Sequence, residues 1–123
     1  MKSKKKILLV EDERAVCELM RHVLEGHGYK FESAFNGIEA LQKIDNISPD
    51  LVIMDINMPQ MDGWQALTAL KSSPKTSQIP VIMCTEENSF ADIEKANDLG
   101  CESYITKPIT AERVLKKIKE ALG

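Results

Sequence analysis

Five short runs of apolar residues recur along the chain, separated by longer segments of mixed polarity. The third and fourth runs are rich in Val and Ile and show little alternation with polar residues. This pattern is typical of parallel strands that are buried on both faces of a sheet. We therefore predict strands at residues 7–10, 31–34, 51–54, 79–83 and 103–105, of which the second has the weakest pattern.

A segment with helical periodicity follows each predicted strand. Apolar residues there recur with the three- and four-residue spacing of a single helix face. Asp62 and Thr110 are suited as N-caps of the third and fifth helices. Gly26 and Gly28 end the first helix, and Gly100 ends the fourth. The helical stripes consist of Val16, Leu19, Met20, Val23 and Leu24; Ile38, Leu41 and Ile44; Ala66, Leu67 and Leu70; the weaker set Phe90, Ile93 and Ala96 or Asn97; and Val114, Leu115, Ile118, Ala121 and Leu122.

Strands and helices thus alternate five times, and these ten elements use up the chain. Alternation with short connections predicts an α/β fold, because right-handed crossovers place helices on both faces of a parallel sheet. A length of 123 residues is that of one domain. We expect a single domain over residues 1–123, with its core at about residues 5–122.

Composition and charge exclude several classes of function. The net charge of -3 shows no basic excess, which argues against nucleic acid as a direct ligand. No apolar stretch approaches the roughly 20 residues that span a bilayer, and no secretory signal is recognisable. We therefore expect no membrane insertion and a cytoplasmic location. The three cysteines lack C-x-x-C spacing and are expected to be free thiols.

Charged residues stand at the ends of three of the predicted strands. Glu11 and Asp12 follow the first strand, Asp55 follows the third, and Lys107 lies just beyond the fifth. The carboxyl ends of parallel strands meet at one edge of the sheet, where ligands bind. Clustered carboxylates repel one another unless a cation neutralises them, and such oxygen ligands suit Mg²⁺. The alternative is a set of separate, solvated acids at loop starts, which their position at adjacent strand ends disfavours.

Two further residues add weaker signals at the same edge. Thr85 follows the fourth apolar run, where its hydroxyl can donate to a phosphoryl oxygen or form a local cap. Lys107 precedes Pro108, and an X-Pro bond has access to the cis form, which would direct the lysine across the sheet edge. Neither signal is specific when taken alone.

The motifs at these strand ends resemble those of the receiver domain of two-component response regulators. The resemblance covers residues 5–122 and implies a flavodoxin-like sheet with strand order 2-1-3-4-5 and five helices, as in single-domain regulators of the chemotaxis type. The matching segments are Val10-Glu11-Asp12-Glu13, Met54-Asp55-Ile56-Asn57-Met58-Pro59, Met61-Asp62-Gly63, Tyr104-Ile105-Thr106-Lys107-Pro108, Gly26-His27-Gly28-Tyr29 and Asn36-Gly37-Ile38-Glu39-Ala40-Leu41.

The resemblance implies a phosphoryl-transfer site. Asp55 would accept the phosphoryl group from a sensor histidine kinase or a histidine phosphotransfer protein, and Lys107 would hold a phosphoryl oxygen. Mg²⁺, or Mn²⁺ in its place, would bind Asp12, Asp55 and the main-chain carbonyl of Asn57. Glu11 would help directly or through water. Such chemistry depends mainly on placement and on neutralisation of charge.

The resemblance also implies a switch. Thr85 would move toward the phosphoryl group and Tyr104 would fill the vacated space, which would alter a protein-binding surface on the fourth helix, fifth strand and fifth helix. Asn57, Glu86 and Glu87 are expected to tune the lifetime of the phosphoryl group. The family usually has a small residue where this chain has Glu86. That acid would repel the phosphoryl group, narrow access to it or extend into solvent, and we favour the last.

Three other functions fit parts of the pattern. A Mg²⁺-dependent phosphatase or phosphotransferase acting through an aspartyl phosphate would need an acid at Asn57. A nucleotide binder would need a Gly-rich loop after the first strand, where Glu11 and Asp12 stand instead. A receiver that has lost its chemistry would not be expected to keep the acceptor, metal-ligand and lysine positions. We therefore expect a signalling module, and not an enzyme beyond its own phosphorylation and dephosphorylation, with no output domain in this chain.

Overall fold

The computed structural model describes residues 3–86 and 90–123 of the chain. Five parallel strands form one sheet in the order β2-β1-β3-β4-β5, which confirms the expected topology. The elements in chain order are β1 (Lys6–Val10), α1 (Arg14–Gly26), β2 (Lys30–Ala34), α2 (Gly37–Ile47), β3 (Leu51–Asp55), α3 (Gly63–Ser72), β4 (Val81–Thr85), α4 (Phe90–Asp98), β5 (Ser103–Thr106) and α5 (Ala111–Leu122).

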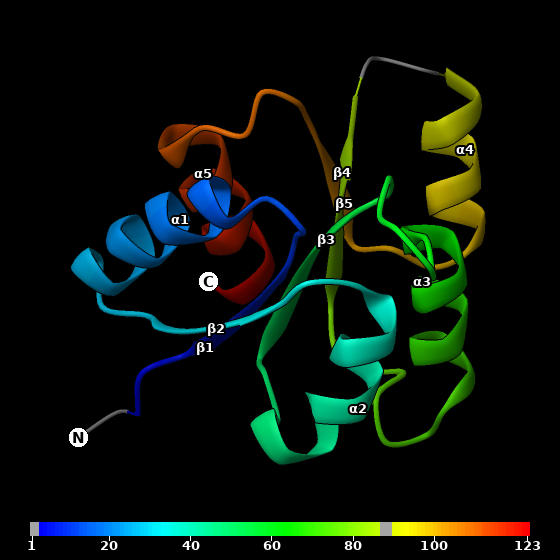
Figure 1. Ribbon diagram of the computed structural model, residues 1–123, viewed down its shortest axis with the longest axis horizontal. Helices are drawn as coiled ribbons and strands as arrows, with labels where there is room; N and C mark the ends of the chain where they lie inside the picture. Colours follow the sequence, from blue (N-terminus) through cyan, green and yellow to red (C-terminus); the bar gives the residue numbers. More distant parts are fainter. Residues whose placement is uncertain (1–2, 87–89) are drawn as a thin grey trace.

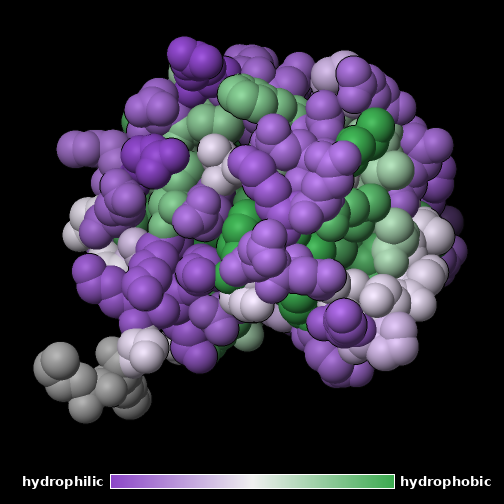
Figure 2. Space-filling model, turned by 60° about the horizontal axis from the view of Figure 1, so that its bottom comes forward, coloured by the Kyte–Doolittle hydropathy of each residue, from purple (hydrophilic) through white to green (hydrophobic). Residues whose placement is uncertain are grey.

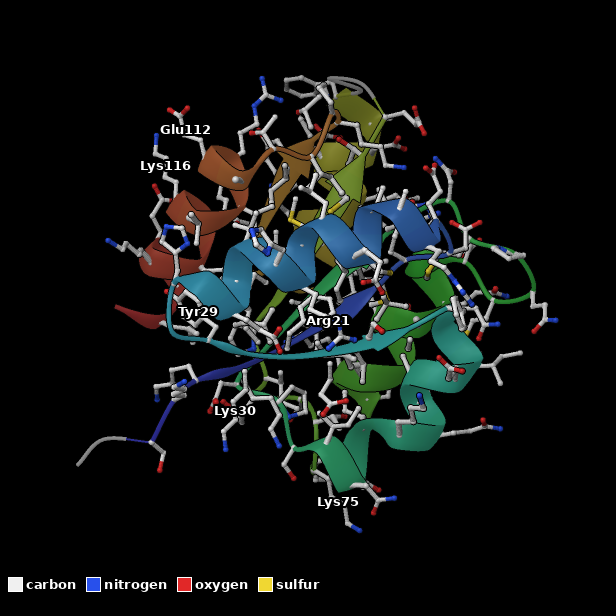
Figure 3. All side chains as sticks on the ribbon, turned by 60° about the vertical axis from the view of Figure 1, so that its left-hand side comes forward. Arg21, Tyr29, Lys30, Lys75, Glu112 and Lys116 are labelled. Carbon is white, nitrogen blue, oxygen red and sulfur yellow. The ribbon has the colours of Figure 1, made fainter. Side chains whose placement is uncertain are left out.

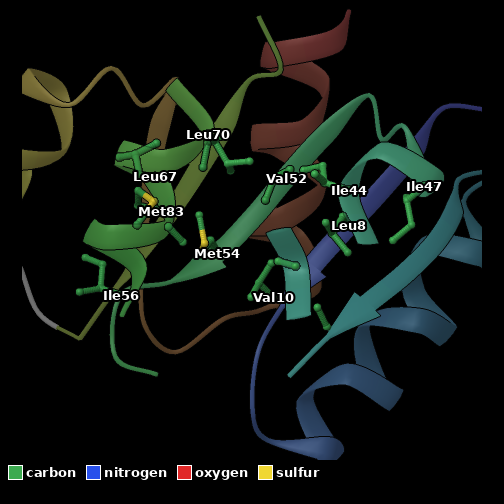
Figure 4. Packing of buried hydrophobic residues seen from close by; sticks show 14 of the residues in the cluster. Leu8, Val10, Ile44, Ile47, Val52, Met54, Ile56, Leu67, Leu70 and Met83 are labelled. Atoms are coloured by element: carbon green, nitrogen blue, oxygen red, sulfur yellow. The ribbon is translucent and has the colours of Figure 1, made fainter. Parts of the chain in front are cut away.

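Helices cover both faces of the sheet, with α1 and α5 on one face and α2, α3 and α4 on the other (Figure 1). Successive residues of β1 pack into opposite layers, so that Ile7 and Leu9 face α1 and α5, and Leu8 and Val10 face α2 and α3. Figure 4 shows the second of these clusters, in which Leu8 and Val10 lie near side chains of β3 and of the covering helices. Burial on both faces explains why the central strands show no polar alternation.

The strand boundaries differ from the predicted ones in a way that affects the site. The fourth strand spans Val81–Thr85 rather than residues 79–83, because Pro80 lacks a backbone N–H and cannot donate to the ladder. The third strand likewise extends to include Asp55. Asp55 and Thr85 are therefore the last residues of their strands, and not the first residues of the following loops. Backbone pairing within the sheet consequently fixes the position of both.

Side-chain caps define where three of the helices begin. Asp62 accepts a hydrogen bond from the backbone N–H of Gln65 at 2.9 Å, and the Gln65 side chain accepts one from the N–H of Asp62 at 3.1 Å. This capping box and the bond from the N–H of Arg113 to Thr110 confirm the two predicted N-caps. Asn36 caps α2 in the same way. The start of α3, close behind β3, is thus held firmly.

The surface agrees with the moderate charge of the chain. Figure 2 shows the side that lies at the bottom of Figure 1, where hydrophilic residues surround smaller hydrophobic areas. Within residues 3–86 and 90–123, no helix combines the length and the apolar character that crossing a membrane requires. The thiols of Cys17, Cys84 and Cys101 are free, and the first two are buried.

Candidate functional site

The predicted acids meet at the carboxyl edge of the sheet. Val10 pairs with Met54, so the residues that follow in β1 and β3 bring Glu11 close to Asp55. Asp12 comes next in the chain, and carboxylate oxygens from the three acids lie within 4.8 Å of one another. Glu11 and Asp55 are each only 2% exposed, whereas Asp12 is exposed. The strand pairing therefore builds the predicted acidic cluster.

Asp55 has a hydrogen-bond donor on each carboxylate oxygen. Lys107 donates from Nζ to Oδ2 at 2.8 Å, and the backbone N–H of Asn57 donates to Oδ1 at 3.0 Å. Lys107 directly follows the edge strand β5, which β4 separates from β3, and its peptide bond to Pro108 is cis. Because both oxygens are held, the carboxylate has a defined orientation at the mouth of the site.

The lysine is correspondingly strongly basic. Burial alone lowers the pKa of Lys107, but the hydrogen bonds and negative charges of Asp55 and Glu86 outweigh this effect and raise the pKa above its ordinary value. The ammonium group is therefore charged at every physiological pH. It supplies a fixed positive charge beside Asp55.

The surroundings of Glu11 favour the neutral form of its side chain, whereas those of Lys107 favour the charged form. Burial, followed by the charge of Asp55 and a side-chain hydrogen bond with Asp12, raises the pKa of the Glu11 carboxyl group to about 7, although the N–H of Glu13 at 3.1 Å partly opposes the rise. Lys107 also lowers this pKa, but to a smaller extent. Burial and the neighbouring acids thus both disfavour the ionised form of Glu11.

The donor set fits a hard divalent cation. At metal–oxygen distances of about 2.0–2.1 Å, octahedral geometry separates adjacent ligand oxygens by about 2.9 Å and opposite ones by about 4.1 Å. The 4.8 Å limit on the separations among the oxygens of Glu11, Asp12 and Asp55 requires only a small contraction. A dication would also remove the repulsion that raises the pKa of Glu11.

The two predicted switch residues lie at different depths. Thr85 is 1% exposed, and its carbonyl accepts a hydrogen bond from the backbone N–H of Lys107 at 2.7 Å, so it directly adjoins the lysine. Tyr104 lies on the edge strand β5, half-buried, with Nζ of Lys117 6.0 Å from its ring centroid. The geometry therefore brings Thr85 to the acidic cluster and leaves Tyr104 on the outer edge of the sheet.

Tyr104 borders a groove of about 480 Å³ between β5 and α5. Basic side chains from α5 line it, among them Arg113, Lys116 and Lys117. Figure 3 shows Glu112 and Lys116 extending from the outer side of α5. This is the surface for which protein binding was expected.

The structure describes two of the three residues that were expected to tune the lifetime of the phosphoryl group. Glu86 is largely exposed, as favoured from the sequence, yet its Oε1 lies 3.3 Å from Nζ of Lys107 instead of extending freely into solvent. The Asn57 side chain is exposed, and its backbone N–H bonds Asp55. Glu87 falls outside the described residues.

Gly63 supports the site, although it received no role from the sequence. Its N–H donates to the carbonyl of Ile56 at 2.8 Å, and a Cβ here would lie 2.5 Å from the carbonyl oxygen of Asp55. Glycine therefore allows the first turn of α3 to lie against the end of β3. In the sequence, the glycine directly after the N-cap Asp62 was the signal that could have indicated this close approach.

Comparison with known proteins agrees with this geometry. The chain matches the response regulator receiver domain over residues 7–119. It is 37% identical over 119 residues to the polar-differentiation response regulator DivK of Brucella anthropi, which covers 97% of both chains. The structure is similar to that of the chemotaxis protein CheY4 of Vibrio cholerae, with a TM-score of 0.91 and 30% identity over 97% of this chain and 99% of that one.

A further solved structure extends the comparison to a receiver domain that is part of a kinase. The signal receiver domain of a signal transduction histidine kinase from Syntrophus aciditrophicus is 36% identical, with a TM-score of 0.87 over 96% of this chain and 89% of that chain. Sequence, fold and the position of the acidic cluster thus point to the same assignment. The chain belongs to the response regulator receiver domain family, whose members act in phosphorylation-dependent signalling.

Proposed function

We propose that Asp55 is the phosphoryl acceptor and that the phosphoryl group comes from a phosphohistidine of a sensor histidine kinase or a histidine phosphotransfer protein. One observation carries the proposal. Asp55 is a nearly buried carboxylate at a strand end, held by Lys107 at 2.8 Å and adjoined by the two acids of the cluster. Membership of the receiver family supports the same role.

The transfer needs little from the protein beyond placement and charge. A carboxylate oxygen of Asp55 attacks phosphorus, and the bond from phosphorus to the histidine nitrogen breaks. The electron pair returns to the imidazole, which takes up a proton from solvent. Lys107 neutralises charge on a phosphoryl oxygen during this step. Hydrolysis by water later releases phosphate and restores the carboxylate.

We assign the acidic cluster to Mg²⁺, with Mn²⁺ as a substitute. Asp12, Asp55 and the main-chain carbonyl of Asn57 would hold the ion, and Glu11 would contribute directly or through a water molecule. When bound, the ion supplies positive charge to the phosphoryl oxygens. The closeness of the carboxylates and the raised pKa of Glu11 support this assignment.

We further propose that phosphorylation is read by another protein. The Thr85 hydroxyl would bind the new phosphoryl group, and Tyr104 would turn inward in response. The surface of α4, β5 and α5 around the Tyr104 groove would then bind its partner differently. Asn57, Glu86 and Glu87 would set how long the phosphoryl group persists.

This function is that of a signalling protein which catalyses only its own phosphorylation and dephosphorylation. We place it in the cytoplasm, where it would meet a kinase or phosphotransfer protein. It would act without direct contact with nucleic acid and without membrane insertion. The net charge of -3 is consistent with the expectation about nucleic acid.

Incubation with phosphoramidate and Mg²⁺, followed by intact-mass measurement, tests the proposal. We expect one phosphoryl adduct, absent without Mg²⁺ and absent in Asp55→Asn. Asp45→Asn, which makes the same change on the exposed surface of α2, should retain it. An adduct that persists in Asp55→Asn would contradict the acceptor assignment. Continuous phosphate release from many small phosphoesters would favour an enzyme instead.

A further inference from the structure

The ammonium group of Lys107 has two carboxylate partners of very different kinds. Asp55 Oδ2 lies 2.8 Å away on a side chain that is 3% exposed. Glu86 Oε1 lies 3.3 Å away on a side chain that is 63% exposed. Glu86 directly follows the last residue of β4, so the lysine from the end of β5 links two neighbouring strand ends.

A phosphoryl group on Asp55 would compete for the same ammonium. Lys107 has three N–H donors in a compact head, and two already face carboxylates. Asp55 is buried and cannot exchange the lysine for water, whereas Glu86 can turn to solvent at little cost. When further oxygens arrive beside Lys107, Glu86 is therefore the partner that leaves.

We propose that Glu86 is an exchangeable counter-ion of Lys107, bound to the ammonium before phosphorylation and displaced from it by the phosphoryl group. The inference rests on the proposed role of Asp55. It gives Glu86 a positioning role that acts through Lys107. The negative charge of Glu86 at the mouth of the site repels small anionic phosphodonors. Its release from Lys107 changes the end of β4 when the protein is phosphorylated.

The first test uses the unphosphorylated, metal-free protein. Glu86→Gln, Lys107→Gln and the double variant form a double-mutant cycle, read from urea unfolding at low ionic strength. We expect the cycle to reveal a coupling of about two- to fivefold in the unfolding equilibrium constant, the range of a partly exposed ion pair. A cycle that closes without coupling would show that the two side chains do not interact in solution, and would overturn the proposal.

The second test measures phosphorylation by acetyl phosphate with Mg²⁺, from the initial rate of adduct formation by mass. Glu86→Gln keeps the length of the side chain and should react about two to five times faster at low ionic strength. Glu86→Asp retains the charge and should stay close to the unaltered protein. Glu32→Gln removes one exposed charge from the edge strand β2 and serves as the matched control.

Salt separates an electrostatic effect from a steric one. The advantage of Glu86→Gln should vanish near 1 M salt, where the Debye length falls to about 3 Å. An advantage that persists in high salt, or that Glu32→Gln reproduces, would refute the counter-ion role. If all variants form the adduct at one rate, only this inference fails. If none forms it, the acceptor assignment of Asp55 fails as well.

Discussion

Replacing Glu11 with glutamine is expected to raise the free energy of unfolding of the metal-free protein at neutral and alkaline pH. Glu11 is nearly buried, and burial together with the neighbouring acids makes its ionised form unfavourable. The glutamine side chain has the same shape and retains an oxygen that can accept the N–H of Glu13. The substitution therefore removes the charge with little change in packing.

The magnitude follows from the pKa of Glu11, which lies at about 7 in the folded protein and at 4.5 without burial. Below pH 4.5 both states are protonated and the group has no effect on stability. Between these values the folded state holds a proton that the unfolded state has lost, so stability falls as pH rises. Above pH 7 the full cost applies, about 3 kcal/mol at 1.36 kcal/mol per pH unit.

Urea unfolding in EDTA, followed by the fluorescence of Trp64 from about pH 5 to about pH 8, measures this difference. Lys107 adds no pH dependence in that range, because the stability that its raised pKa contributes is fully present below its ordinary value of 10.5 and is lost only at higher pH. The free energy of unfolding of Glu11→Gln should increase relative to that of the unaltered protein as pH rises. That of Glu32→Gln should not. Parallel pH profiles for all three proteins would refute the reasoning.

Three further predictions concern the same site. Asp12→Ala should stabilise the metal-free fold by about 1 kcal/mol, because it removes repulsion between carboxylate oxygens that lie within 4.8 Å of one another, and should weaken Mg²⁺ binding in a Trp64 fluorescence titration. Gly63→Ala should lower the free energy of unfolding in urea by about 1–3 kcal/mol, since its Cβ would overlap the carbonyl of Asp55. Lys107→Met should destabilise the protein by about 3 kcal/mol near pH 8, because Asp55 stays buried without its counter-ion, and adding Asp55→Asn should restore most of the loss. Equal stabilities of the single and double variants would contradict the last prediction.

The apolar pattern predicted the strands well because burial on both faces leaves a strong signal. From it followed the acidic cluster at the carboxyl edge, which pairing of β1 with β3 brings together. The predicted fourth strand was wrong by two residues at each end, because Ile79 is apolar without being in the ladder, and Pro80 accepts a hydrogen bond from the N–H of Val52 but has no N–H to donate. Hydropathy reports burial, and hydrogen-bond capacity decides where a strand begins.

Other parts of the site depend on contacts that no local pattern contains. The ion pair of Glu86 and Lys107 joins residues 21 positions apart and depends on side-chain rotamers. The role of Gly63 depends on how closely α3 approaches β3, which becomes apparent only in three dimensions. The sequence motifs therefore indicated the residues of the candidate site, and the structure was needed to describe which contacts hold them in place.

Asp55 ends β3 and the other two acids of the cluster follow β1, whereas the outer faces of the helices carry no part of the acidic cluster within the described residues. In the proposed function, the acceptor site and the helical part of the partner-binding surface thus occupy separate sets of positions. After gene duplication, two copies could diverge on their helical surfaces and acquire different partners while both keep an intact acceptor. This separation would let related pathways in one cell acquire separate partner specificities while both keep the same phosphoryl-transfer site.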